Sequence, residues 1–288
     1  MHKLVFLFIF LFSSSLFSAA SPPSEEESSP PSNNNSSNNT AKDNSSTPGP
    51  SANINISRDD HLFILYKKSY DLVYEKKYTK AYEGLPENSV VYCCFNKHYK
   101  ITPKIFDIWV DILKNVENSI LWLNSAEEDT KKNIFDYSKE KGLDPKKIFF
   151  TKRSISYPEY LSKHQLADIF LDTNPFSAHS TGCGSLWAGV PIITVLGKSF
   201  ANNVCASLLK SLDMEELISQ NFDEYKNKAI DLGKNPSKLL NIKKKIRKNV
   251  IHSPLFNSKS YTKNLEKAFS QIYQVKKNKL KTEDIIIH

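Results

Sequence analysis

Short apolar runs alternate with amphipathic stretches from residue 84 almost to the carboxyl terminus, and this alternation constrains the fold more than any other feature of the sequence. The runs predict strands at 90–95, 120–123, 148–150, 168–171 and 192–195. The amphipathic stretches predict a helix that starts at Pro103, helices at 130–141, 159–165 and 180–188, and further helices to the end of the chain. Strands that alternate with helices predict a doubly wound parallel α/β sheet, which binds ligands at the carboxyl ends of its strands.

Local sequence signals mark the ends of several predicted helices. Thr102 is a suitable N-cap and Pro103 occupies the first helical position, ahead of apolar residues that fall on one helix face. Gly142 and Gly189 follow the helices at 130–141 and 180–188, as expected for glycines that end a helix in the left-handed conformation. These end signals agree with the alternation and support the same fold.

The first 20 residues have the layout of a secretory signal peptide. Lys3 precedes an apolar run at 4–12, and small residues lead up to Ala20. The run is too short for a comfortable membrane span, and a signal anchor that stays uncleaved is the alternative. We therefore expect the chain to enter the secretory pathway or to be extracellular.

Four further segments follow the predicted signal peptide. Residues 21–57 are almost all Ser, Asn, Pro, Glu and Thr, which predicts a disordered linker because so few large apolar side chains are available to bury. Residues 58–83 predict a polar helical extension that packs on the surface. The α/β lobe is expected at 84–275 and a basic tail at 276–288.

The net charge of +8 comes largely from two basic stretches, at 243–248 and 276–281. Because these lysines lack interleaved aromatic residues, they favour solvated helix faces, and we expect no nucleic-acid partner. A basic patch that attracts phosphate or anionic lipid is the alternative. The four cysteines lack metal-ligand spacing and are interpreted as core residues: Cys93, Cys94, Cys183 and Cys205.

A polar turn after the predicted strand at 168–171 carries a candidate phosphate site. It places His179, Ser180 and Thr181 at the start of the next predicted helix, together with the backbone N–H groups of that first turn, including that of Gly182. Unpaired N–H groups at a helix N-terminus suit a diphosphate. The alternative is ordinary N-capping by Ser180 or Thr181, with His179 as a structural loop residue.

A second polar cluster, at 96–100, follows the first predicted strand and falls at the same edge of the sheet. Lys100 is expected to reach phosphates bound at the helix start, and Lys97 lies in the same loop. The alternative is that Lys100 is an ordinary exposed lysine. No pair of aspartates suited to Mg²⁺ lies near either cluster in the sequence, which favours a site that uses no metal and no cofactor. The 8 glycines form neither a G-x-G-x-x-G nor a P-loop pattern.

Seven blocks of the sequence resemble, in order, the protein O-GlcNAc transferase and SPINDLY-type glycosyltransferase family. They are GLPE at 84–87, VYCCFN through YKI at 91–101, QLAD at 165–168, LDT at 171–173, AHST at 178–181, LWAGVP at 186–191 and SPLFN at 253–257. The resemblance implies the Rossmann-like C-terminal half of a two-lobed GT-B glycosyltransferase, in which this half holds the nucleotide sugar and the reaction takes place in the cleft between the lobes.

The resemblance also implies roles for both polar clusters. Lys100 matches the family's lysine that neutralises the donor pyrophosphate and helps the nucleotide leave, so it is the implied catalytic residue. His179, Ser180 and Thr181 match the family's His-Thr-Thr turn at the phosphates and ribose. The expected nucleotide-sugar site is therefore Lys97, Lys100, His179, Ser180, Thr181 and Gly182. The implied reaction is inverting, metal-independent transfer from a UDP- or GDP-linked sugar, with UDP-GlcNAc as the expected donor, to Ser or Thr of a protein.

The sequence departs from the family at three site positions. Gly184 stands where the family has an acid that binds the ribose, Tyr160 where it commonly has a histidine near the base, and Lys97 where it has an amide. The family's N-terminal catalytic lobe and helical repeats find no match before residue 84. Two alternatives therefore stay open: a non-catalytic secreted module that binds nucleotide sugars or proteins, and a fragment of a larger transferase. A protein acceptor and a separate N-terminal lobe are the expected protein partners.

Overall fold

The computed structural model describes residues 78–152, 154, 156–279 and 281. The predicted signal peptide at 1–20, the predicted linker at 21–57 and most of the predicted extension at 58–83 lie outside the described residues, as does most of the predicted basic tail. None of the helices within the described ranges is long and apolar enough to cross a membrane.

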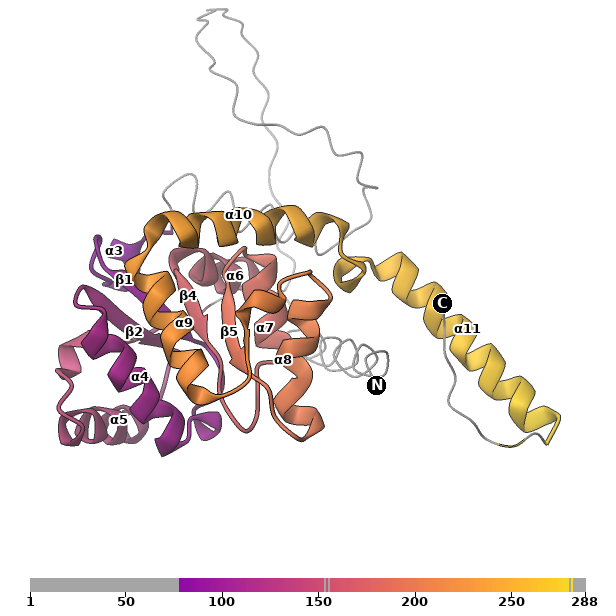
Figure 1. Cartoon of the computed structure of the whole chain (residues 1–288), viewed down its shortest axis with the longest axis horizontal. Helices are drawn as coiled ribbons and strands as arrows, with labels where there is room; N and C mark the ends of the chain where they lie inside the picture. Colours follow the sequence, from indigo (N-terminus) through magenta and orange to yellow (C-terminus); the bar gives the residue numbers. More distant parts are fainter. Residues whose placement is uncertain (1–77, 153, 155, 280, 282–288) are drawn as a thin grey trace, which may run out of the picture.

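The described residues form a parallel sheet with helices on both faces (Figure 1). The strands are β1 Val90–Cys94, β2 Ser119–Leu123, β3 Ile148–Phe150, β4 Ile169–Leu171, β5 Ile192–Val195 and β6 Ile218–Ser219. The α-helices are α3 Lys80–Glu83, α4 Pro103–Asn115, α5 Glu128–Glu140, α6 Tyr157–Leu166, α7 Ser180–Trp187, α8 Phe200–Lys210, α9 Phe222–Lys234, α10 Pro236–His252 and α11 Ser258–Lys277. Short 3₁₀ turns connect them: η1 His98–Lys100, η2 Pro145–Lys147, η3 Glu215–Leu217 and η4 Pro254–Phe256.

In the strand order β3-β2-β1-β4-β5-β6 the chain first adds strands on one side of β1 and then, from β4 on, on its other side. The order therefore reverses between β1 and β4, although all strands stay parallel. Both neighbours of β1 pair with it in parallel, with Val90 opposite Ser119 on β2 and Tyr92 opposite Ile169 on β4. This is the strand order of doubly wound nucleotide-binding sheets, whose ligands bind where the order reverses. The predicted fold class is therefore confirmed, and the segments after β1 and β4 are the expected place for a site.

The helices cover the sheet as the amphipathic pattern requires. Helices α4 and α9 lie side by side on the near face in Figure 1, and α6 and α7 pack against each other behind it. The predicted start of α4 is confirmed, because the Thr102 hydroxyl accepts a hydrogen bond from the Ile105 N–H (3.4 Å). Gly142 and Gly189 follow α5 and α7 with φ of 69° and 80°, which fits the predicted left-handed helix ends.

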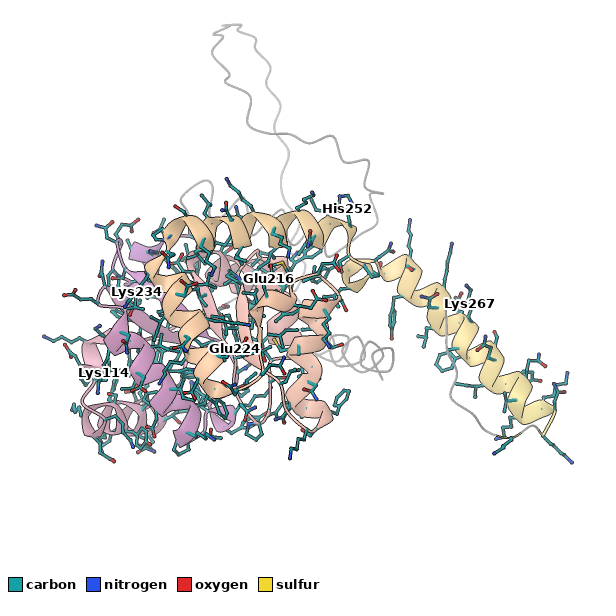
Figure 2. All side chains as sticks on the ribbon, viewed as in Figure 1. Lys114, Glu216, Glu224, Lys234, His252 and Lys267 are labelled. Atoms are coloured by element: carbon teal, nitrogen blue, oxygen red, sulfur yellow. The ribbon has the colours of Figure 1, made fainter. Side chains whose placement is uncertain are left out.

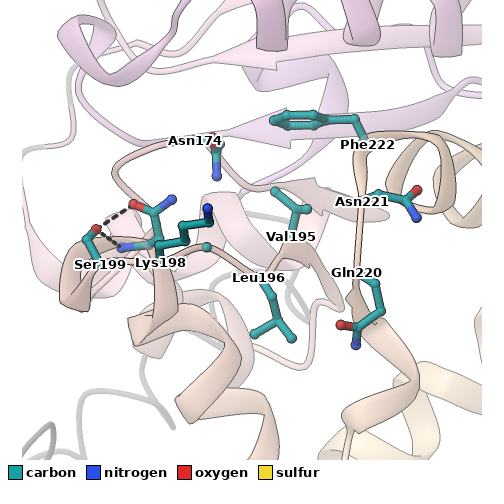
Figure 3. Close-up of a pocket in the computed structure, with 10 residues that line it drawn as sticks. Asn174, Val195, Leu196, Lys198, Ser199, Gln220, Asn221 and Phe222 are labelled. Carbon is teal, nitrogen blue, oxygen red and sulfur yellow. Dashed lines mark hydrogen bonds between the residues drawn. The ribbon is translucent and has the colours of Figure 1, made fainter.

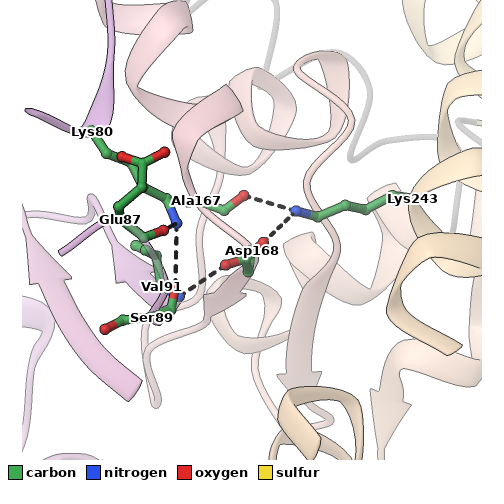
Figure 4. A network of polar contacts seen from close by, with 7 residues as sticks. All are labelled: Lys80, Glu87, Ser89, Val91, Ala167, Asp168 and Lys243. Carbon is green, nitrogen blue, oxygen red and sulfur yellow. Dashed lines mark hydrogen bonds and ion pairs between the residues drawn. The ribbon is translucent and has the colours of Figure 1, made fainter. Parts of the chain in front are cut away.

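An ion pair ties α10 to the amino-terminal edge of the sheet (Figure 4). The Lys243 Nζ donates to Asp168 Oδ1 (2.8 Å) and to the Ala167 carbonyl (3.1 Å), and Asp168 Oδ2 accepts the Val91 N–H (3.0 Å). Asp168 therefore satisfies a strand N–H and a helix lysine together, which explains a carboxylate at this position. The contact lies at the opposite edge of the sheet from the polar clusters that follow β1 and β4.

The two ends of the lobe differ from the prediction. Tyr78 and Glu83, in the predicted surface extension, are buried, and the Tyr78 hydroxyl donates to the Glu83 carboxylate. These two side chains therefore belong to the core, whereas Ala81 and Tyr82 between them are exposed as predicted. At the other end, α11 has no buried residue and projects from the lobe as an arm in Figure 1.

The cysteines behave as the core residues that the sequence predicts. Cys93, Cys94 and Cys205 are buried and Cys183 is half-buried, and all four are free thiols. Burial raises the pKa of each thiol, so these cysteines are neutral at physiological pH.

Candidate functional site

The two predicted polar clusters meet at the carboxyl ends of β1 and β4. The Lys100 Nζ donates to the Ser177 carbonyl (3.2 Å) and lies 3.7 Å from the centroid of the Phe176 ring. Ser177 and Phe176 belong to the turn between β4 and α7, so Lys100 reaches across from the β1 loop to the turn that carries His179. The sequence predicted this meeting, although it did not predict the contact with Phe176.

Asp172 organises the turn between β4 and α7. This carboxylate is only 2% exposed, and it accepts hydrogen bonds from the Ala178 N–H (2.6 Å), the Thr173 N–H (2.8 Å) and the Thr194 hydroxyl (2.7 Å). Burial raises the pKa of Asp172 to about 6, and these hydrogen bonds oppose the rise. A buried carboxylate thus fixes the backbone just before His179.

Helices α4 and α9 also hold this turn in position, through two buried aromatic side chains. The Trp109 indole N–H donates to the Tyr225 hydroxyl (3.0 Å), which in turn donates to the Asp172 carbonyl (3.0 Å). Both aromatic side chains are fully buried. This chain of bonds connects α4 and α9 to the start of the turn, so the position of the turn depends on core packing as well as on local sequence.

His179 lies between two aromatic rings at the start of α7. Its ring centroid is 5.0 Å from that of Phe176 and 6.3 Å from that of Phe200, and its Nε2 lies 3.5 Å from the Ala201 carbonyl. Burial, with the positive charge of Lys100 nearby, lowers the pKa of His179 to about 4. The ring is therefore neutral at physiological pH, and with Nε2 as the donor its Nδ1 is left as an acceptor.

The alternative interpretation, ordinary N-capping by Ser180 or Thr181, is wrong. His179 occupies the cap position without a side-chain capping bond, and Ser180 and Thr181 are the first two residues of the helix. The Thr181 side chain instead hydrogen bonds to Tyr160 on α6. The N–H groups of the first turn of α7 consequently lack an intrahelical acceptor, as at any helix start.

The remaining two predicted site residues contribute less than their position in the sequence suggests. Lys97 is exposed at the rim, immediately before η1. Gly182 is buried in the first turn of α7, where an added Cβ would lie 3.2 Å from Leu208 Cδ1 and 3.3 Å from the Ala178 Cβ. Gly182 therefore packs closely against Leu208 of α8, and without a side chain it can offer a ligand only backbone groups.

Tyr160 fills the space beside Gly184. A Cβ added to Gly184 would lie 3.5 Å from Tyr160 Cε1 and 3.6 Å from His164 Nε2. His164 is fully buried, and neither of its ring nitrogens has a hydrogen-bond partner among the described residues. Burial lowers the pKa of His164 to about 3, so the ring stays neutral. The two departures noted in the sequence, at 160 and 184, are thus in contact with each other.

The described residues include no cluster of three or more His, Cys, Asp or Glu side chains that could hold a metal ion. The arrangement that they do present is one ammonium group opposite a helix start with free N–H groups, which is suited to an anion with two phosphates.

Comparison with known proteins identifies the family. Residues 73–265 match the model of glycosyl transferase family 41. The chain belongs to this family. It is 36% identical over 196 residues to a UDP-N-acetylglucosamine–peptide N-acetylglucosaminyltransferase of Caenorhabditis elegans, a match that covers 68% of this chain and 17% of the relative. It is 35% identical over 193 residues to the probable enzyme of this name, SEC, from Arabidopsis thaliana. This match covers 67% of this chain and 20% of the relative.

Solved structures agree with the family 41 assignment. The fold matches a mutant O-GlcNAc transferase of Thermobaculum terrenum with a TM-score of 0.60 and 25% identity, over 65% of this chain and 38% of that one. A trehalose 6-phosphate synthase of Burkholderia multivorans shares the fold alone, with a TM-score of 0.50 and 10% identity over 73% and 50% of the two chains. The resemblance seen in the sequence is confirmed, and the chain spans about a fifth of the length of the curated relatives that it matches.

Proposed function

We propose that this family 41 lobe binds a UDP-linked sugar such as UDP-GlcNAc and serves its transfer to Ser or Thr of a protein. The observation that carries the proposal is the meeting of Lys100 with the His179–Thr181 turn, at the point where the strand order reverses. The printed names of the two curated relatives supply the donor and the peptide acceptor for those proteins.

Lys100 is the proposed catalytic residue. Its ammonium is held by a neutral carbonyl and an aromatic ring, and no carboxylate of the described residues forms an ion pair with it. Burial lowers the pKa of Lys100, with the charge of Asp172 opposing this effect. The negative charge of a bound pyrophosphate would favour the protonated form of Lys100. The ammonium would then stabilise the negative charge that grows on the departing nucleotide.

The turn at the start of α7 is the proposed phosphate cradle. The N–H groups of Ser180, Thr181 and Gly182 would donate to phosphate oxygens, and neutral His179 would offer its Nδ1 to a hydroxyl of the donor. Lys97 would add charge at the rim. The chemistry needs no metal in this scheme, because Lys100 and the helix start supply the positive potential.

The proposed protein partners would supply the functions that this lobe lacks, namely closure of the cleft and positioning of the acceptor. We propose that a separate N-terminal lobe closes the cleft and positions the acceptor protein, since an open half-site leaves the reacting centre in water. A secretory route remains our proposal for localisation, on the strength of the layout of residues 1–20. Mass spectrometry of the mature chain tests this proposal, and we expect a new N-terminus near Ser21.

Calorimetric titration of the full chain with UDP and GDP tests the site. We expect a dissociation constant in the range of about 1 µM to 1 mM for UDP, in keeping with half a cleft. Lys100→Met should weaken binding about tenfold or more, as expected for the loss of a charged hydrogen-bond donor. The matched control is Lys234→Met, on the exposed end of α9 that is labelled in Figure 2, which should bind UDP like the wild type.

Three results would count against this proposal. If neither nucleotide binds at millimolar concentration, the lobe is a protein-interaction module. If Lys100→Met and Lys234→Met behave alike, Lys100 is not at the pyrophosphate. If a relative's separately expressed N-terminal lobe, added with UDP-GlcNAc and a Ser/Thr peptide, gives no transfer while UDP still binds, the catalytic part of the proposal fails.

A further inference from the structure

A second cavity opens at the same edge of the sheet, on the β5–β6 side of the turn that follows β4 (Figure 3). Its volume is about 460 Å³. We call it the amide pocket, and its lining residues are Asn174, Val195, Leu196, Gly197, Lys198, Ser199, Asn202, Gln220, Asn221 and Phe222. None of the predicted nucleotide-sugar residues lines it, so the pocket needs an account of its own.

The floor of the amide pocket is rigid. The Asn203 side chain donates to the Gly197 carbonyl (2.9 Å) and accepts the Gly197 N–H (3.0 Å), which locks the loop after β5 to α8. The side chain of Asn202 packs directly on this loop, because a Cβ at Gly197 would lie only 2.0 Å from Asn202 Nδ2. The Ser199 hydroxyl in turn donates to Asn202 Oδ1 (2.7 Å). The loop that forms this side of the pocket is therefore held in place by α8, whereas the side chains of Lys198 and Gln220 are exposed.

Four of the lining residues carry a side-chain amide, and of these Asn221 points towards α9 and away from Lys198 in Figure 3. Asn202 Oδ1 and Asn221 Oδ1 accept bonds from Ser199 and from the Glu224 N–H, but their NH₂ groups have no partner among the described residues. The side-chain amides of Asn174 and Gln220 likewise have none there. Amide groups that donate and accept side by side match the hydroxyl groups of a sugar.

The amide pocket is also positively charged. In Figure 3 the Lys198 ammonium points into the space between Asn174 and Val195, and it has no ion-pair or hydrogen-bond partner within the described part of the chain. The Lys104 ammonium lies 4.4 Å from the centroid of the Phe222 ring, which adds a second positive charge at that wall. No lining residue is acidic. An anionic group is therefore favoured over a neutral or cationic one.

We propose that the amide pocket binds a phosphorylated monosaccharide. Lys198 holds the phosphate, the amides of Asn174, Asn202 and Gln220 bind the ring hydroxyls, and the Phe222 ring offers a flat apolar wall to the C–H face of the sugar. The volume lies within the range of about 300–1,000 Å³ that is usual for small-molecule sites. The site is separate from the proposed nucleotide site and does not depend on it.

Calorimetry with glucose 6-phosphate, glucose and inorganic phosphate as probes tests this proposal on the full chain. We expect glucose 6-phosphate to bind more tightly than either of the other two probes. Lys198→Met should weaken that binding about tenfold, since it removes the ammonium and keeps the aliphatic stem. Lys210→Met, at the exposed carboxyl end of α8, is the matched control and should leave it unchanged. Gln220→Ala should weaken glucose 6-phosphate and leave inorganic phosphate unaffected, because it removes only a hydroxyl contact.

Each contrary result is informative. Equal binding of glucose 6-phosphate and inorganic phosphate would overturn sugar recognition, and equal behaviour of Lys198→Met and the wild type would overturn the site itself. UDP affinity should be the same with and without saturating glucose 6-phosphate; competition between them would show that the two ligands share one site and would overturn the separation. Failure of UDP to bind would refute the proposed function and leave this inference standing.

Discussion

Asp172→Asn is the substitution that most directly tests how the turn between β4 and α7 is held in position. The change is isosteric, so the side-chain oxygen can still accept the Ala178 and Thr173 N–H groups, and the new NH₂ faces the Thr194 hydroxyl, which can rotate to accept. What the substitution removes is a buried negative charge. Its effect should therefore appear as a change in the pH dependence of stability.

The sign follows from the direction of the pKa shift. Burial raises the pKa of Asp172 from 3.8 to about 6, so between these values the folded protein binds more protons than the unfolded chain. The free energy of unfolding that this group contributes therefore rises as the pH falls through 6. Linkage gives a gain of about 1.4 kcal/mol between pH 7.5 and pH 5, out of about 3 kcal/mol over the whole window.

Urea unfolding of the wild type and Asp172→Asn at pH 7.5, 6.5, 5.5 and 5 measures this contribution. The difference in the free energy of unfolding between the two proteins should change by about 1.4 kcal/mol in favour of the wild type as the pH falls from 7.5 to 5. Comparing the pair cancels the opposite contributions of His164 and His179, whose pKa values are lowered by burial. Asp129→Asn, on the exposed start of α5, is the control and should show no such trend. A difference that stays constant with pH would refute the reasoning.

Two further substitutions test other parts of the lobe. Lys243→Met should lower the free energy of unfolding by about 1–3 kcal/mol, because it leaves the Asp168 carboxylate half-buried without its cation; Lys244→Met, exposed on the same helix, should change urea unfolding little, and equal losses would contradict the role of the ion pair. Tyr160→Phe should raise UDP affinity about threefold by freeing the Thr181 hydroxyl, if the net value of one hydrogen bond is about 0.5–1.5 kcal/mol. Weaker UDP binding by this variant would show that the Tyr160 hydroxyl helps to hold the ligand.

Most of the sheet could be predicted because its strands are buried on both faces and therefore appear as continuous apolar runs. The strands at 148–150 and 192–195 match their predicted bounds, and the others differ by one residue at an end. β6 was missed because it consists only of Ile218 and Ser219, too short for any periodicity. It follows a helical stretch and joins the sheet only because β5 supplies its partner, which is tertiary information.

The two halves of the candidate site could be placed at one sheet edge from topology alone, since parallel strands put the segments after β1 and β4 next to each other. The groups that hold those halves in position could not. Asp172 follows an apolar run and reads as the end of a strand, yet its carboxylate satisfies donors from Thr194 on β5 as well as from its own turn. Nothing local in the sequence distinguishes such a residue from a solvated aspartate.

Tyr160 and Gly184 are a second case in which the sequence alone does not show that two residues are neighbours. In the sequence the two positions are separate departures from the family, and each alone suggests a weakened site. In the structure they are neighbours, because the tyrosine ring lies beside Gly184 and its hydroxyl bonds to Thr181. If the proposed donor places its ribose here, it meets an aromatic ring rather than an empty space. A donor must either displace that ring or bind against it, and the Tyr160→Phe titration separates these cases, since only displacement is made easier by losing the hydroxyl.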